Sequence, residues 1–226
     1  MIRRIYILII ILTVSPFWLF ACSATSPADT TTGKAPDRLV TIEAQAEDII
    51  DFAPSGNWQR INTDVTTISE AWRTYQPEAT KDGATQAMLD AFNAALADLE
   101  TGASTQDKTG TMQASNDISA VVVDLFELYH PVIPADVGRF DVLERQVILD
   151  TAKGNFTGVS DDLTKINKIW ETLKPSILAH NGRETADQFE ASLSTQAKAS
   201  AAKDVKALTD EANNALELVD AMENLY

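Results

Sequence analysis

The sequence predicts an all-α protein, an up-and-down helical bundle built from two tandem pseudo-repeats. Three observations support this prediction. Apolar residues recur at spacings of three and four residues, which is typical of the buried face of an amphipathic helix. No run shows the sustained alternation of apolar and polar residues that indicates a strand. Residues about 40–130 are similar to residues about 139–226, and each repeat consists of about three helices preceded by a short leading helix.

The repeat is clearest at an offset of 98 residues. Gly56–Pro77 aligns with Gly154–Pro175 without a gap, and eight of the 22 paired positions are identical. After a deletion of one residue the offset becomes 97, which pairs Phe92 with Phe189. Tandem duplication is the simplest account, although shared helical periodicity alone would produce some of these matches.

Each repeat opens with a leading helix, expected at about 40–52 and about 139–153. The next helix carries an apolar stripe that steps by three and four residues. The stripe residues are Trp58, Ile61, Val65, Ile68, Trp72 and Tyr75 in repeat one, and Phe156, Val159, Leu163, Ile166, Trp170 and Leu173 in repeat two. Pro77 and Pro175 are expected to end these helices, because a proline removes a backbone donor and clashes with the preceding turn.

The remaining two helices of each repeat follow the same periodicity. One is expected at about 85–100 and about 184–197, and a longer one over 115–129 and 205–226. Their short connections favour antiparallel neighbours packed as a bundle.

The first 21 residues have the layout of a secretory signal peptide, with Arg3 and Arg4 before an apolar run. Leu19-Phe20-Ala21-Cys22 resembles the lipobox of bacterial lipoproteins, which has an aliphatic residue three positions before the cysteine and a small residue directly before it. The resemblance implies cleavage before Cys22, a diacylglyceryl group on its thiol and acylation of the new amino terminus. An uncleaved transmembrane anchor is the alternative, but a run interrupted by Pro16 is short for a spanning helix.

Behind the signal peptide, residues 22–38 are expected to form the lipidated Cys22 and a flexible tether, because they are rich in Ser, Thr, Ala and Pro. Residues 39–226 form the predicted helical domain. Two or three acyl chains hold a protein stably on a bilayer, so the expected partner of Cys22 is the membrane itself. The resemblance implies an extracytoplasmic location on the bacterial cell membrane, and Ser23 implies the outer membrane if the host is Gram-negative.

Composition excludes several classes of protein. The chain has 18 basic and 33 acidic side chains, a net charge of -15, and a single cysteine. An acidic surface repels a polyphosphate backbone, so no nucleic-acid partner is expected. Without a second thiol, the domain has neither a disulfide nor a thiolate metal site.

Several residues at matching repeat positions are expected to have structural roles. Trp72 and Trp170 lie on the apolar stripes, where a large ring fills the space between helices and its indole N–H reaches a polar edge; ligand stacking is the alternative. Asp64 and Asp162 lie beside the stripe, where a carboxylate can cap a helix or pair across helices; structural ion pairs are expected, and a functional site is the alternative. Asn116 and Asn213 are expected to bond to a neighbouring helix, since a mid-helix asparagine is otherwise unfavourable.

Glu127 and His130 have the Glu-x-x-His spacing by which ferritin-like bundles hold two iron ions. The match is weak, because Glu127 falls on the face opposite the apolar stripe. Repeat two has Asn224 there and no histidine after it. No metal or other cofactor is therefore expected, and Glu127 and His130 remain weak candidate ligands.

Glu47 and Arg145 are paired by the 98-residue offset but have opposite charges. If the halves pack about a pseudo-twofold axis, matching positions can face each other. We therefore expect Arg145 to pair with Glu47 or Glu43 across the halves. The alternative is that both side chains point into water.

These features predict a lipid-anchored, non-enzymatic helical lipoprotein of the cell envelope that binds a protein partner or small ligand, or acts as a scaffold. The sequence has no Gly-x-Ser-x-Gly motif, no free thiol and no phosphate-binding glycine loop. The alternative is a metal- or cofactor-handling bundle, because a strongly acidic protein concentrates cations.

Overall fold

The structure, a computed structural model, describes residues 34–226, and this part of the chain consists of eight α-helices and one 3₁₀ turn without any strand. The predicted all-α class is therefore confirmed. The helices are α1 (Asp37–Phe52), α2 (Trp58–Asp82), α3 (Gln86–Thr105), α4 (Lys108–Phe126), α5 (Ala135–Lys153), α6 (Phe156–Ala179), α7 (Arg183–Ala202) and α8 (Val205–Glu223), with the turn η1 (Glu127–Tyr129) after α4. Within residues 34–226, no helix is long and apolar enough to cross a membrane.

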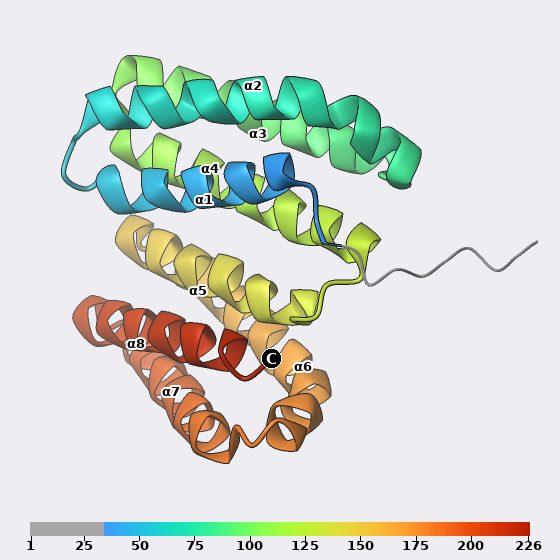
Figure 1. The fold of residues 1–226 in the computed structure, drawn as a ribbon. Coiled ribbons are helices and arrows are strands. Elements are labelled where there is room, and N and C mark those ends of the chain that lie inside the picture. The colour runs from blue at the N-terminus through green and yellow to red at the C-terminus, as the bar shows by residue number, and fades with distance from the viewer. Residues whose placement is uncertain (1–33) are drawn as a thin grey trace, which may run out of the picture. The chain divides into compact units, whose positions relative to one another are not determined.

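The helices pack as two four-helix sets (Figure 1). In the first set α1 packs against α2 and α4, and α3 packs against α2 and α4; α5–α8 repeat these neighbours. Each set encloses its own hydrophobic core, one between Leu39 and Leu125 and the other between Val137 and Met222. We call the two sets the first and second bundles.

The two bundles correspond element by element. Their helices begin at Asp37 and Ala135, Trp58 and Phe156, Gln86 and Arg183, and Lys108 and Val205, which are the sequence offsets of 98, 98, 97 and 97 residues. The caps also match. Asn57 and Asn155 each accept a hydrogen bond from the backbone three residues on, at the starts of α2 and α6. Asp107 and Asp204 do the same for α4 and α8.

The structure corrects the expected end of the tether. The tether was expected to extend to residue 38, but α1 begins at Asp37. The signal peptide at 1–21 and Cys22 lie outside the described residues.

Pro77 and Pro175 do not end their helices, contrary to the expectation; both lie inside them. A proline removes only one backbone donor, and the extra turn buries Ala79 in the first core and Ile177 in the second. Gly83, with a positive φ of 110°, ends α2 in the left-handed conformation that suits glycine.

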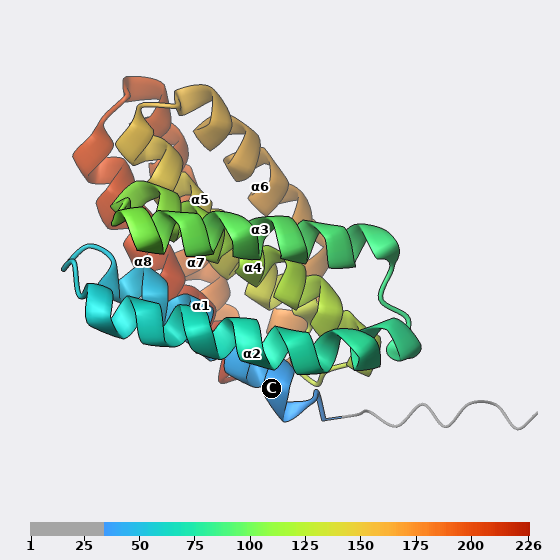
Figure 2. The same cartoon turned by 90° about the horizontal axis from the view of Figure 1, so that it is seen from above.

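The bundles meet chiefly where α4 packs against α5, which lie next to each other in both views (Figure 2). Gly138 of α5 faces Val123 of α4, and a Cβ at position 138 would lie 3.1 Å from Val123 Cγ2. The small residue therefore allows the two helices to approach closely.

Candidate functional site

A cavity of about 500 Å³ opens beside the junction of the bundles. It is lined by acidic side chains from three helices and by residues of the end of α4, the connector after it and the start of α5. We call it the acidic cleft. Its charged lining is Glu43, Glu47 and Asp51 of α1, Asp141 and Arg145 of α5, and Asp220 and Glu223 of α8; its apolar lining includes Val123, Phe126, Pro131, Ile133 and Pro134.

The pairing expected between Glu47 and Arg145 is present. Arg145 Nη2 donates a hydrogen bond to Glu47 Oε1 at 3.0 Å, joining α5 of the second bundle to α1 of the first. Arg145 has the only basic side chain in the lining, against six carboxyl groups. Burial alone would lower the pKa of Arg145, but Asp141 and Glu47 outweigh it and raise the pKa, so the guanidinium stays charged.

Two carboxyl groups of the cleft titrate near neutrality. Burial raises the pKa of Glu43 to about 7, and the charges of Glu47 and Glu223 add to this effect. Burial also raises the pKa of Asp141 to about 7, although Arg145 opposes the change. The cleft therefore gains negative charge as the pH rises through 7, and a bound cation would favour this ionisation.

Most residues of this cleft were not predicted from the sequence. Glu43, Glu47 and Asp51 follow each other at intervals of four residues, so they lie on one face of α1. That spacing is visible in the sequence. The contribution of α8 is not, because it depends on how α8 packs against α5.

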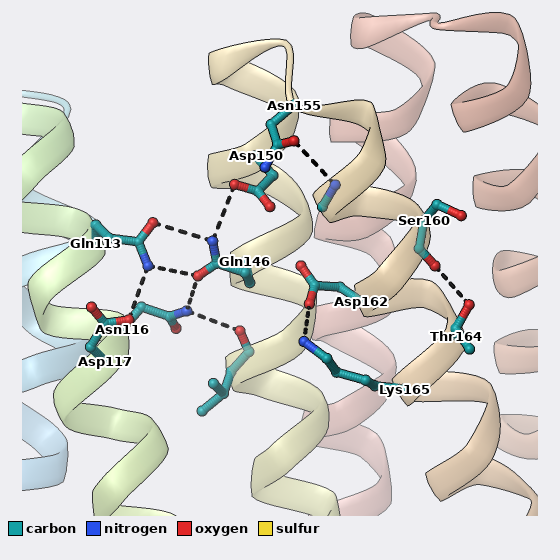
Figure 3. Close-up of polar contacts among 12 residues, drawn as sticks. Gln113, Asn116, Asp117, Gln146, Asp150, Asn155, Ser160, Asp162, Thr164 and Lys165 are labelled. Carbon is teal, nitrogen blue, oxygen red and sulfur yellow. Dashed lines mark hydrogen bonds and ion pairs between the residues drawn. The ribbon is translucent and has the colours of Figure 1, made fainter. Parts of the chain in front are cut away.

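A second polar group lies on another side of the junction (Figure 3). Asn116 of α4, as expected, bonds to a neighbouring helix: its Nδ2 donates to the Val142 carbonyl at 3.1 Å and to Gln146 Oε1 at 3.2 Å. Gln113 and Gln146 exchange hydrogen bonds between the same two helices.

The expectation for Asn213 is wrong. Asn213 is exposed, and its Nδ2 donates to the Thr209 carbonyl of its own helix at 2.8 Å. Asn116 lies at the junction, whereas the matching position on α8 has no further bundle beyond it among residues 34–226. Matching sequence positions therefore have different surroundings.

The two tryptophans fill the cores, as expected. Trp72 stacks on Phe92 with ring centroids 3.8 Å apart, and its indole N–H donates to Asn93 Oδ1 at 2.7 Å. Trp170 packs against Phe189 and donates to Glu190 Oε1 at 3.1 Å. Both rings are at least 95% buried, so packing accounts for both residues.

The two aspartates form structural ion pairs as expected, but the partner of each lies in its own helix and not across helices. Asp64 accepts a hydrogen bond from Arg60 Nε at 2.9 Å, and Asp162 accepts one from Lys165 Nζ at 2.8 Å. Both carboxyl groups are buried, which raises their pKa although the partner charges lower it. Arg60 also pairs with Asp48 of α1.

Glu127 and His130 are not brought together as a metal site. Glu127 Oε1 accepts a hydrogen bond from Arg139 Nη1 at 2.9 Å, and Arg139 also pairs with Asp124 and Asp136. His130 follows η1 in the left-handed conformation, with φ of 49°. In residues 34–226, no three side chains of His, Cys, Asp or Glu form a group suited to a metal ion.

A buried carboxyl group that was not predicted from the sequence is that of Glu144 of α5, whose Oε1 accepts a hydrogen bond from Gln196 Nε2 at 3.1 Å. The 98-residue offset assigns Ala46 to the same position in the first bundle, and this difference is visible in the sequence.

Comparisons with protein-family models, curated proteins and solved structures found no significant match to this chain.

Proposed function

We propose that this protein is a lipid-anchored, non-enzymatic binding module of the bacterial cell envelope, and that the acidic cleft binds a small organic cation with an apolar portion. The observation that carries the proposal is the mixed lining of the cleft, which contains both charged and apolar side chains. A cavity of about 500 Å³ is within the usual size of small-molecule sites, and such a lining suits an amphiphilic ligand.

The charge of the cleft indicates the sign of the ligand's charge. The lining contains six carboxyl groups and one guanidinium group, so an anion would be repelled and a cation attracted. Glu43 and Asp141, whose pKa values are about 7, would lose protons when the cation binds. Binding is therefore tighter at pH 8 than at pH 6.

The proposed location is supported by the sequence alone: the lipobox-like Leu19-Phe20-Ala21-Cys22 and the polar stretch behind it. A cleft carried on such a tether faces the extracytoplasmic side, on the outer membrane if the host is Gram-negative. We also propose that the two bundles arose by tandem duplication, which the equal offsets and matched helix caps support.

Handling of a metal or cofactor is the alternative function. No described group of side chains favours it over the binding module, since carboxylates without convergent neighbours bind hard cations weakly.

Titration calorimetry on the full-length protein in detergent tests the proposal, with n-butylamine as the probe and 1-butanol and butyrate as neutral and anionic analogues. We expect butylamine to bind and each analogue to bind about tenfold more weakly or not at all. Glu43→Gln and Asp141→Asn weaken butylamine binding and reduce its dependence on pH. Glu100→Gln, an exposed acid of α3, is the matched control and leaves binding unchanged. Equal affinity for the three probes, or no effect of the two cleft variants, would contradict the proposal.

A further inference from the structure

Next to the caps of α2 and α6, one pair of matching positions holds different residues: Arg60 in the first bundle and Gly158 in the second. Arg60 donates its backbone N–H to the Asn57 cap at 3.3 Å, and Gly158 donates its own to the Asn155 cap at 3.2 Å. Both residues are thus third in their helices, and the sequence offset also pairs them. The first bundle has a guanidinium side chain there, and the second has none.

Arg60 supplies the cation for this corner of the first bundle. Its guanidinium reaches from α2 to α1, pairs with Asp64 and Asp48, and lies 5.4 Å from the centroid of the Phe52 ring. Two acceptors on different helices suit the planar, forked geometry of a guanidinium group.

A cavity of about 480 Å³ lies beside Gly158, lined by α4 of the first bundle and by α5 and α6 of the second. A Cβ at position 158 would lie too close to Asp150 Oδ2, so a side chain there would require the Asp150 carboxyl group to move. Four carboxyl groups line this Gly158 cavity, those of Asp117, Asp150, Asp161 and Asp162, with Lys165 as the single cation in the lining.

Asn116, one of the residues that line the Gly158 cavity, also has an unpartnered buried acceptor. Asn116 is 1% exposed, and its Oδ1 has no hydrogen-bond partner among the described residues. Its Nδ2 is already used by two carbonyl acceptors, so the amide cannot be turned to satisfy Oδ1 without losing those bonds. In Figure 3, Asn116 points from α4 toward α5, and Asp162 points from α6 toward the same helix. A donor with several N–H groups is what this arrangement lacks.

We propose that the Gly158 cavity binds a guanidinium group, which supplies to the second bundle the cation that Arg60 supplies to the first. The site is separate from the acidic cleft and does not depend on the function proposed for it. The group is carried by a free guanidino compound or by an arginine side chain of a peptide.

The acceptors favour a guanidinium over a simple ammonium ion. A guanidinium has five N–H donors in a fixed plane, whereas an ammonium group is a compact point charge that the nearby Lys165 already provides. Lys165 bonds only to Asp162 Oδ1, and its side chain is 61% exposed, so it can turn outward when the cavity fills. The amino end of α6 is unfavourable for a cation, but Arg60 occupies the same place on α2 because its two carboxylates outweigh that effect.

Titration of the full-length protein with methylguanidine, and separately with methylamine, tests the proposal. We expect methylguanidine to bind at least about tenfold more tightly than methylamine. Asp162→Asn abolishes the difference, and Lys165→Gln tightens methylguanidine binding because it removes the competing cation. Comparing agmatine with a short arginine-containing peptide distinguishes the two sources of the group.

Two further variants serve as controls for a loss of folding. Asp161→Asn alters an exposed carboxyl group in the lining and should weaken binding without affecting the fold. Asp210→Asn removes an exposed carboxyl group that pairs with Lys206 on α8 and should have no effect. The proposal is overturned if methylguanidine does not bind, if methylamine binds equally well, or if Asp161→Asn and Asp162→Asn both leave binding unchanged.

Discussion

Glu144 is a carboxyl group enclosed in the core of the second bundle. It is fully buried, its Oε2 and the Gln196 Oε1 both have no partner among the described residues, and burial raises its pKa to about 8. Protonation of the Glu144 carboxyl group adds an O–H donor beside two oxygen atoms, Glu144 Oε2 and Gln196 Oε1, that have no hydrogen-bond partner. Glu144 is therefore neutral at pH 7.

The raised pKa of Glu144 makes the protein less stable as the pH rises. The folded protein binds the Glu144 proton up to about pH 8, whereas the unfolded chain releases it near its ordinary pKa of 4.5. The contribution to stability is full below pH 4.5 and is lost as the pH rises toward 8.

We predict that Glu144→Gln makes the free energy of unfolding less sensitive to pH and raises it by about 1 to 3 kcal/mol at pH 8.5. The glutamine keeps an acceptor for Gln196 and adds a donor without a charge. Urea denaturation at pH 5 and pH 8.5 measures both effects, with Glu100→Gln as a surface control. An unchanged difference between the two pH values would show that Glu144 does not titrate in this range.

Single residues were predictable from sequence when their partner lies within the same helix or at a matching position. Asp64 and Asp162 have partners three or four residues away, and Glu47 and Arg145 are linked by the repeat offset. The six carboxyl groups of the acidic cleft were not predictable as a group, because they come from α1, α5 and α8, whose meeting depends on tertiary packing.

The helices themselves were predictable because local signals agree with the final packing. Stripes spaced by three and four residues became the buried faces of α2 and α6. The exception is instructive. Pro77 and Pro175 were strong local stop signals, but burial of one more turn outweighs a single lost hydrogen bond.

The caps of α4 and α8 allow a matched test of the two bundles. Asp107 accepts a hydrogen bond from Gly110 N at 3.1 Å, and Asp204 accepts one from Ala207 N at 3.0 Å. We predict that Asp107→Ala and Asp204→Ala each lower the free energy of unfolding by about 1 kcal/mol, since each leaves an amide donor without its cap.

Asp107→Asn and Asp204→Asn are the controls, because asparagine caps nearly as well as aspartate. Thermal and urea denaturation of the four variants give the comparison. A loss confined to one bundle would mean that the matched caps do not contribute equally.

At the scale of the whole molecule, the chain consists of a proposed signal peptide and lipid anchor followed by a helical domain. Cys22 lies outside residues 34–226, so the proposed lipid anchor rests on the sequence motif alone. We predict that Cys22→Ala abolishes incorporation of labelled palmitate and releases the protein from membranes under an alkaline wash, because the acyl chains are its only expected anchor.

Ser23→Ala, next to the modified residue, is the control and should still incorporate the label. Cys22→Ala protein that is processed normally and resists the wash would instead indicate an uncleaved transmembrane anchor.

The two cores are linked through five residues, His130–Pro134, between η1 and α5. Pro131 and Pro134 fix two of the φ angles in this connector. So short a linker keeps each bundle at a high effective concentration relative to the other, on the order of millimolar. If the bundles part, reassociation is intramolecular. The contacts between α4 and α5 therefore hold the bundles together more effectively than the same contacts would hold two separate chains.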